Sequence, residues 1–195
     1  MRMMSMIRLF ILSLSLILLS VEAVAEKPPL LDLRREFTVF DNILTSAQPT
    51  RSEFELAAQK GFKTVINLRS PGEIGSWNER KKIEALGMRY VSIPVSGLDD
   101  FNINTLNEIN EIVFETAFEA KGFVLIHDSN ANRVGALMAL EAFFNHDMSV
   151  QEAVDIGKKS GMTTLEDYIL TLLFDSESSY DDDSDLDAFD DLFME

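Results

Sequence analysis

One segment of the chain carries the residues best suited to bind an anion. Residues 124–137 read VLIHDSNANRVGAL, which is an apolar strand, a polar loop and the start of a helix. Successive backbone N–H groups in such a loop, together with the positive end of the following helix, attract negative charge. Arg133 adds a planar, permanently charged guanidinium that suits the oxygens of phosphate or sulfate. The segment therefore predicts an oxyanion site beyond the carboxyl end of a strand.

The loop resembles the catalytic loop of cysteine-dependent phosphatases and sulfurtransferases, and this resemblance implies a nucleophile directly after His127, where this chain has Asp128. Phosphoryl or sulfur transfer at a loop of this kind uses a thiolate, and the chain contains no cysteine. A carboxylate about 4 Å from a phosphate costs on the order of 4 kcal/mol per pair of unit charges at a surface-like dielectric. We therefore expect Asp128 to fill the anion site itself, held by the loop N–H groups and Arg133.

Aspartyl-phosphate chemistry is the alternative role for Asp128. Enzymes that phosphorylate an aspartate typically offset the charge with a bound magnesium ion. No second acidic cluster adjoins the loop in the sequence, so we expect Asp128 to be inactive.

The other loop residues each have two interpretations. His127 either orients the loop by hydrogen bonding or is a buried structural histidine. The short residues that follow either contact a ligand or only form a tight turn; they are Ser129, Asn130, Ala131 and Asn132.

Acidic and basic side chains outside the loop are further candidates. Asp99 and Asp100 follow a predicted strand, and either one is a candidate general acid. A role in a turn or at a helix start is the competing interpretation. Arg69 ends another predicted strand, where it either lines the pocket or forms a surface ion pair.

Strands and helices alternate along the chain. Short apolar runs predict strands at residues 37–40, 63–68, 88–94 and 123–126, and residues 43–49 are predicted to be a strand end that leads to a turn. Helical spacing and Ser/Thr-x-x-Glu capping patterns predict helices at residues 50–59, 78–86, 106–118 and 134–144, with two more after Ser149 and Thr163. This order predicts an α/β fold with a parallel-rich central sheet flanked by helices.

Four segments resemble a bacterial family, the phosphatase-like domain of beta-lactamase-hydrolase-like proteins, which is related in fold to protein tyrosine and dual-specificity phosphatases. The segments are TSAQPT at 45–50, FKTVINLR at 62–69, EALGMRYVSIPV at 84–95 and HDSNANRVGAL at 127–137. The resemblance covers residues 37–162 and implies a tyrosine-phosphatase-like fold.

The chain departs from that family at its loop. Members usually carry cysteine at position 128 and glycine at position 131, where this chain has Asp128 and Ala131. Four residues separate Asp128 from Arg133, whereas tyrosine phosphatases have five, and the shorter spacing is nearer to rhodanese-type sulfurtransferase loops. The resemblance therefore implies a degenerate member, a pseudophosphatase with a binding or regulatory role. The alternative is a phosphatase-like hydrolase that acts on a phosphorylated substrate without a cysteine.

Composition divides the chain into four parts. Residues 1–25 predict a cleaved signal peptide, with two early arginines, an apolar run and Ala-Val-Ala before position 26. An uncleaved anchor is the alternative. Residues 26–36 are predicted to be an N-terminal lead-in, residues 37–174 the phosphatase-like domain, and residues 175–195 an acidic disordered tail. We therefore expect a periplasmic or secreted protein with no stable membrane span after cleavage.

Charge and composition limit the partners. The net charge of −16 argues against nucleic acid and anionic membranes as partners. The absence of cysteine excludes disulfides, and the two histidines, His127 and His146, have no metal-binding spacing. We expect no cofactor and no metal, and an unknown protein or small anionic ligand as the partner.

Overall fold

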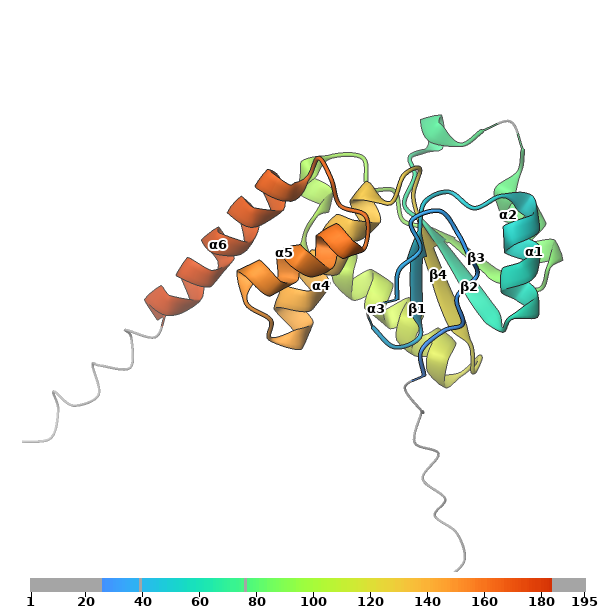
Figure 1. Cartoon of the computed structure of the whole chain (residues 1–195), viewed down its shortest axis with the longest axis horizontal. Coiled ribbons are helices and arrows are strands. Elements are labelled where there is room, and N and C mark those ends of the chain that lie inside the picture. Colours follow the sequence, from blue (N-terminus) through green and yellow to red (C-terminus); the bar gives the residue numbers. More distant parts are fainter. Residues whose placement is uncertain (1–25, 39, 76, 184–195) are drawn as a thin grey trace, which may run out of the picture.

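A computed structural model describes residues 26–38, 40–75 and 77–183. It contains a parallel four-stranded sheet in the order β1-β4-β2-β3. The strands are β1 Ile43–Ser46, β2 Phe62–Asn67, β3 Arg89–Ser92 and β4 Phe123–His127. Helices cover both faces of the sheet (Figure 1). The α/β fold predicted from the alternation of elements is therefore confirmed.

Six α-helices and two short 3-10 turns are described. The helices are α1 Arg51–Gln59, α2 Glu79–Ala85, α3 Ile103–Phe118, α4 Asn132–His146, α5 Val150–Lys159 and α6 Glu166–Asp183. The 3-10 turns are η1 Pro71–Glu73 and η2 Leu98–Asp100. Both turns follow strands at the carboxyl edge of the sheet, which is also the edge of the predicted anion loop.

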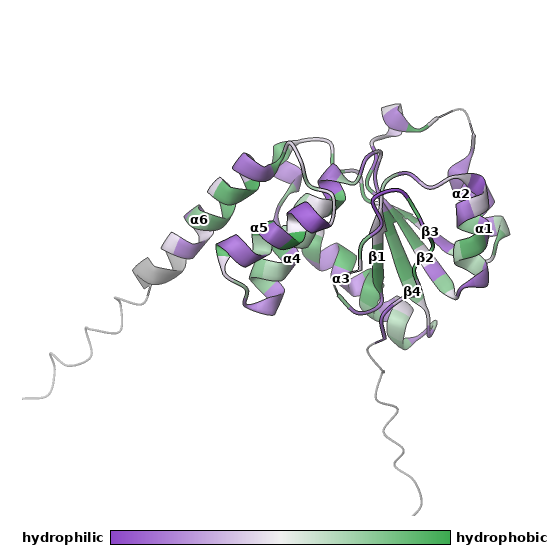
Figure 2. Ribbon diagram, in the orientation of Figure 1, coloured by the Kyte–Doolittle hydropathy of each residue, from purple (hydrophilic) through white to green (hydrophobic). Residues whose placement is uncertain are grey.

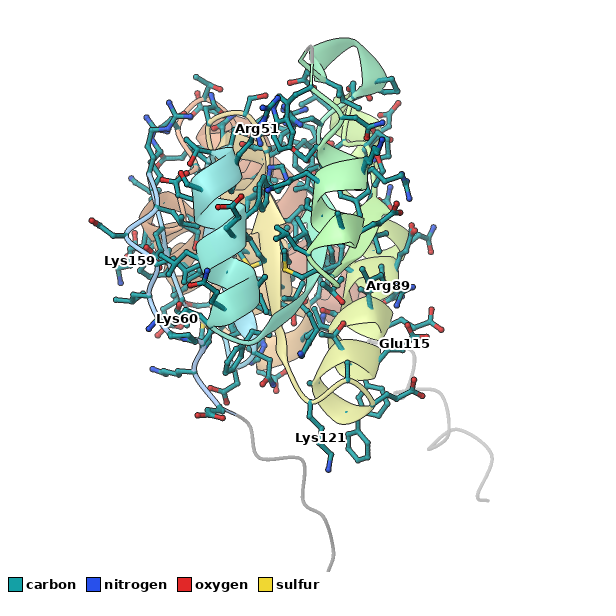
Figure 3. All side chains as sticks on the ribbon, turned by 90° about the vertical axis from the view of Figure 1, so that its right-hand side faces the viewer. Arg51, Lys60, Arg89, Glu115, Lys121 and Lys159 are labelled. Carbon is teal, nitrogen blue, oxygen red and sulfur yellow. The ribbon has the colours of Figure 1, made fainter. Side chains whose placement is uncertain are left out.

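Side chains that alternate along the strands build two cores. Successive strand residues point to opposite faces of a sheet, so Leu125 belongs to one core and Ile126 to the other. The first core includes α1 and α2, and the second includes α3, α4, α5 and α6. Figure 2 shows the apolar strands in the middle of the molecule, with polar residues on the outer helix surfaces. Figure 3 looks onto the α1 side, where Arg89 of β3 and Glu115 of α3 form an ion pair of 2.6 Å.

Two of the three predicted capping boxes form. Thr50 and Ser149 each cap a helix reciprocally with the glutamate three residues on. The box predicted at Thr163 is wrong, because the Thr163 backbone N–H and hydroxyl both donate to Asn132 Oδ1. Thr163 therefore fastens the end of the anion loop instead of capping α6.

The lead-in predicted at residues 26–36 is part of the folded body. Leu31 and Leu33 are buried in the core beside α1, and the Glu36 carboxylate accepts both of their backbone N–H groups. The strand predicted at residues 37–40 is reduced to one antiparallel bridge between Phe37 and Thr45. We call residues 26–36 the N-terminal strap.

The disordered tail predicted from Asp175 begins too early, because α6 continues to Asp183. Ile169 and Leu173 anchor the helix in the core, and each further residue then adds one hydrogen bond at little nucleation cost. The predicted signal peptide and residues 184–195 of the predicted tail lie outside the described residues. Within the described ranges, no helix is long and apolar enough to span a membrane.

Candidate functional site

The predicted anion loop joins the end of β4 to the start of α4. His127 is the last residue of β4, and Ala131 is the N-cap residue of α4. Such a position brings backbone N–H groups and a helix N-terminus together at the carboxyl edge of a parallel sheet.

The Asp128 carboxylate is fully buried and accepts four backbone N–H groups of this loop. Oδ1 accepts from Asn130 at 2.6 Å and from Ala131. Oδ2 accepts from the backbone N–H groups of Arg133 at 2.7 Å and Val134 at 3.3 Å. The N–H groups that would bind an oxyanion therefore surround an internal carboxylate.

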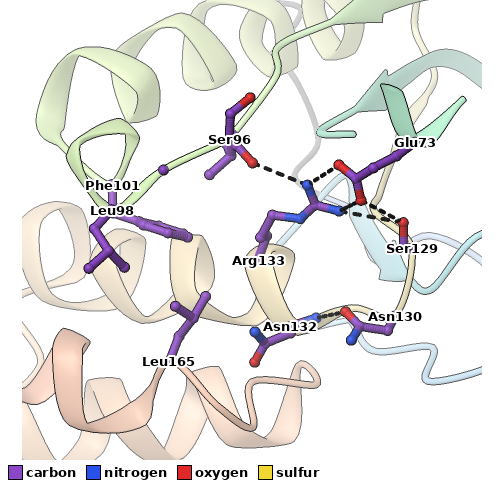
Figure 4. A pocket seen from close by; sticks show the side chains of 11 residues that line it. Glu73, Ser96, Leu98, Phe101, Ser129, Asn130, Asn132, Arg133 and Leu165 are labelled. Carbon is purple, nitrogen blue, oxygen red and sulfur yellow. Dashed lines mark hydrogen bonds and ion pairs between the residues drawn. The ribbon is translucent and has the colours of Figure 1, made fainter. Parts of the chain in front are cut away.

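The Arg133 guanidinium is held by a second carboxylate, that of Glu73. Nη1 lies 2.7 Å from Glu73 Oε2, and Nη2 lies 2.7 Å from Glu73 Oε1. Nε of Arg133 also lies 3.5 Å from Asp128 Oδ2. The hydrogen bonds from Arg133 lower the pKa of Glu73 to about 2. Both anion-binding parts of the loop are thus occupied by the chain's own acids, as Figure 4 shows for Glu73 and Arg133.

Glu73 is the site residue that the sequence prediction missed. It ends η1, and its Oε2 accepts the backbone N–H of Ser70 at 2.8 Å. The Ser129 hydroxyl donates to Glu73 Oε1 at 3.0 Å. The sequence signal that could have indicated Glu73 is the Ser-Pro-Gly-Glu turn at positions 70–73, because it follows a strand at the same sheet edge as the loop.

Ala131 has the backbone conformation that glycine favours, with φ at +70°. Its methyl group faces Gly161, where an added Cβ would lie 2.6 Å from the Ala131 Cβ. Gly161 itself has φ at +107°. The loop position thus carries the methyl group of Ala131, and the facing position is a glycine, Gly161, which leaves room for that methyl group.

The remaining loop residues hold the turn together and line a hollow. Asn130 Oδ1 accepts the backbone N–H of Asn132, and the Asn132 side chain bonds Thr163 and Thr164. Ser129, Asn130, Asn132 and Arg133 line a hollow of about 390 Å³. Its other wall is formed by Glu73 and by residues 95–98, Phe101 and Leu165.

The N-terminal strap clamps the outside of the loop. Arg35 Nη1 donates to the Asn130 carbonyl at 2.9 Å, and Arg34 Nη2 donates to the Ser129 carbonyl at 3.3 Å. These bonds join the N-terminal strap to the loop through the loop's carbonyl groups.

Asp99 and Asp100 lie in η2 and do not line the hollow. Asp100 Oδ2 accepts the backbone N–H groups of Ser96 at 2.6 Å and Gly97 at 2.9 Å. These bonds, that of Gly97 foremost, lower the pKa of Asp100. A lowered pKa opposes proton donation near neutral pH, so the geometry of Asp100 suits a turn.

A buried polar network lies beneath the loop. Arg69 Nη2 bonds Glu79 Oε2 at 2.9 Å, and His127 Nε2 lies 3.2 Å from Glu79 Oε1. Burial raises the pKa of Glu79, but its partners His127, Arg69 and Gln48 hold it below the usual value. Arg69 therefore forms a buried ion pair instead of lining the hollow or pairing at the surface. In the part of the chain that the structure describes, no three His, Asp or Glu side chains gather in a metal-binding cluster.

The parallel sheet with its flanking helices is a tyrosine-phosphatase-like α/β fold. Two similar solved structures are P. aeruginosa TpbA and Tk-PTP in its active form. TpbA is 18% identical with a TM-score of 0.57, covering 77% of this chain and 89% of that one. Tk-PTP is 19% identical with a TM-score of 0.54, covering 75% and 95%.

The curated relatives carry a more specific name. The chain is 29% identical over 126 residues to a beta-lactamase hydrolase-like protein of Agrobacterium fabrum. The match covers 62% of this chain and 28% of that protein, so it spans about a quarter of the relative's length. No family model matches the chain. The chain thus has a tyrosine-phosphatase-like fold and is similar in sequence, over these 126 residues, to a beta-lactamase hydrolase-like protein.

Proposed function

We propose that this chain is an exported pseudophosphatase, a phosphatase-like protein that binds a partner or ligand and does not hydrolyse phosphate. The observation that carries the proposal is the Asp128 carboxylate, which takes up four backbone N–H groups of the loop. Export rests on the composition of residues 1–25 alone.

Electrostatic repulsion supports the proposal that the loop does not bind phosphate. The Asp128 carboxylate is buried at the position of the missing nucleophile, and a phosphate above it would meet a fixed negative charge. That repulsion is on the order of 4 kcal/mol per pair of unit charges at about 4 Å and a surface-like dielectric. Glu73 adds a second carboxylate at the Arg133 guanidinium.

The alternative, hydrolysis through an aspartyl-phosphate, has less support. Attack on phosphorus needs a free carboxylate oxygen, and both oxygens of Asp128 accept loop N–H groups. Asp100, the general-acid candidate with resolved contacts to backbone N–H groups, is directed into its own turn.

The deciding experiment is a turnover assay with p-nitrophenyl phosphate. We expect no turnover by the wild-type protein and none by Asp128→Asn. Wild-type turnover that is lost in both Asp128→Asn and Arg133→Lys, and kept in Asp99→Asn, would overturn the proposal in favour of the hydrolase.

The Asp128→Cys variant tests whether the lack of a nucleophile explains the expected lack of turnover. We expect Asp128→Cys to hydrolyse p-nitrophenyl phosphate, and we expect a higher rate when Glu73→Gln is added, because the second change frees the Arg133 guanidinium for phosphate. If neither variant is active, the lack of turnover would instead be due to the shorter loop. Cell fractionation of the full chain against residues 26–195 tests export separately.

A further inference from the structure

We infer that the hollow beside Arg133 is a receptor for a peptide carboxylate, taking an acidic side chain followed by an apolar one, and that Glu73 is its internal competitor. This inference rests on the proposed binding role and names the ligand class for it.

The contacts of Arg133 define the charged end of this receptor. Its two Nη atoms each lie 2.7 Å from an oxygen of the Glu73 carboxylate, and the Ser129 hydroxyl donates a third hydrogen bond to Glu73 Oε1 at 3.0 Å. A planar guanidinium recognises a planar carboxylate through two parallel bonds of this kind. Arg133 is thus already shaped around a carboxylate.

Asp128 selects for a single negative charge. Its Oδ2 lies 3.5 Å from Arg133 Nε, so the Asp128 carboxylate already neutralises part of the positive charge of the guanidinium. A phosphate monoester near neutral pH brings almost two negative charges, and the buried Asp128 repels each of them. A carboxylate brings one. The ligand that fits is therefore a carboxylate, and the phosphate expected of a tyrosine-phosphatase-like loop fits less well.

Glu73 is placed so that a ligand can displace it. Its side chain is 36% exposed, and it stands on a turn of only three residues. Surface ion pairs of this kind contribute little net stability, because water competes for both charges. When a ligand carboxylate binds, its two hydrogen bonds with Arg133 replace the two that Glu73 makes.

The hollow supplies the apolar half of the receptor. Leu98, Phe101 and Leu165 line it on the side away from Glu73 (Figure 4). Leu98 is 48% exposed, so apolar surface remains open beside a charged group. An acidic residue at Arg133 would thus place its neighbour against this wall.

The probes are four N-acetyl dipeptide amides: glutamyl-leucine, glutaminyl-leucine, phosphoseryl-leucine and glutamyl-serine. Binding is followed by NMR at pH 7, through the Arg133 Nε–H resonance and the loop amides, with dipeptide up to about 50 mM. We expect glutamyl-leucine to bind most tightly and glutamyl-serine about threefold more weakly. We expect Glu73→Gln to tighten glutamyl-leucine binding about threefold to fivefold, because the internal ion pair that the ligand displaces contributes little net stability.

Two variants and one matched control make the result specific. Arg133→Lys keeps the charge but removes the planar pair of donors, and we expect it to reduce the preference for glutamyl over glutaminyl to the part that charge alone supplies. Glu115→Gln frees Arg89 from an exposed ion pair elsewhere on the protein, and we expect it to change nothing at the hollow.

Any one of four results would overturn the inference. Three are phosphoseryl-leucine binding as tightly as glutamyl-leucine, equal binding of the glutamyl and glutaminyl dipeptides, and no effect of Glu73→Gln. The fourth is absence of binding to both the wild type and Glu73→Gln. The turnover assay is independent, so a catalytically silent protein that fails these tests refutes the carboxylate receptor alone.

Discussion

Glu73 and Arg133 lie sixty positions apart in the chain and meet through two bonds of 2.7 Å each. One residue comes from a turn after β2, and the other from the first turn of α4. The pair ties two neighbouring strand ends together across the mouth of the loop.

This pair makes stability depend on pH. The pKa of Glu73 falls from 4.5 to about 2 on folding, so its contribution is fully present above pH 4.5 and is lost as the pH falls through 2. We expect Glu73→Gln to lower the free energy of unfolding by about 1 kcal/mol at pH 7, a value reduced for solvent screening. The difference should shrink toward zero near pH 2. Urea unfolding at both pH values measures it, and the exposed Glu111→Gln should cost little at either. An equal loss from Glu73→Gln at both pH values would contradict this prediction.

Removing the charge of Asp128 should destabilise the protein. In Asp128→Asn an NH2 group replaces one carboxylate oxygen and faces loop N–H donors, so the two loop N–H groups that bonded this oxygen lose their acceptor. We expect a loss of about 2–3 kcal/mol in the free energy of unfolding, measured by urea at pH 7. The exposed Asp99→Asn is the control, with a change within about 0.5 kcal/mol. A loss below about 1 kcal/mol for Asp128→Asn would show that the loop does not depend on the carboxylate.

The buried pair of Arg69 and Glu79 should behave as a unit. Glu79→Gln leaves the Arg69 guanidinium buried without its counter-charge, and we expect a loss of about 3 kcal/mol. Adding Arg69→Met removes the stranded charge, so the double variant should be more stable than the sum of the two single changes predicts. Glu84→Gln, which breaks an exposed pair with Arg80, should cost less than about 1 kcal/mol. Additive losses at Arg69 and Glu79 would argue against coupling.

The contact of Gly161 with Ala131 gives a second test of coupling. Gly161→Ala adds a methyl group 2.6 Å from the Ala131 Cβ at a position where φ is +107°, and we expect a loss of more than about 2 kcal/mol. Ala131→Gly removes the opposing methyl and should recover part of that loss. The recovery is partial because the Ala131 carbonyl oxygen still lies 3.0 Å away. Gly75→Ala, which enters open space, is the control. Thermal unfolding of the wild type, the two single variants, the double variant and the control compares them. No recovery in the double variant would rule out the methyl contact as the cause.

Local sequence patterns predicted the strands and helices of this protein, because the formation of these elements depends largely on residues that are close in the sequence. The alternation of strands and helices predicted the parallel sheet, and the sequence around Asp128 predicted a loop that joins β4 to α4. Contacts between distant segments were not predictable in this way. Glu73 reaches Arg133 only because parallel pairing puts the ends of β2 and β4 side by side.

Side-chain exposure was less predictable than helix position. The apolar spacing that predicts α3 includes Phe114 and Phe118, yet these two rings are exposed and stack on each other with centroids 5.1 Å apart. The N-terminal strap shows the opposite error. Leu31 and Leu33 alternate with polar residues and are buried, but the segment is too short for periodicity to distinguish it from a linker.

The N-terminal strap also makes the loop sensitive to proteolysis at a distance. Trimming of the chain through Arg35 would remove the two guanidinium donors to the loop carbonyls together with the buried Leu31 and Leu33. The position of the N-terminus would therefore affect both the core beside α1 and the rigidity of the anion loop. A preparation that begins at Phe37 should accordingly be less stable than one that begins at Glu26, and its loop should be held less firmly.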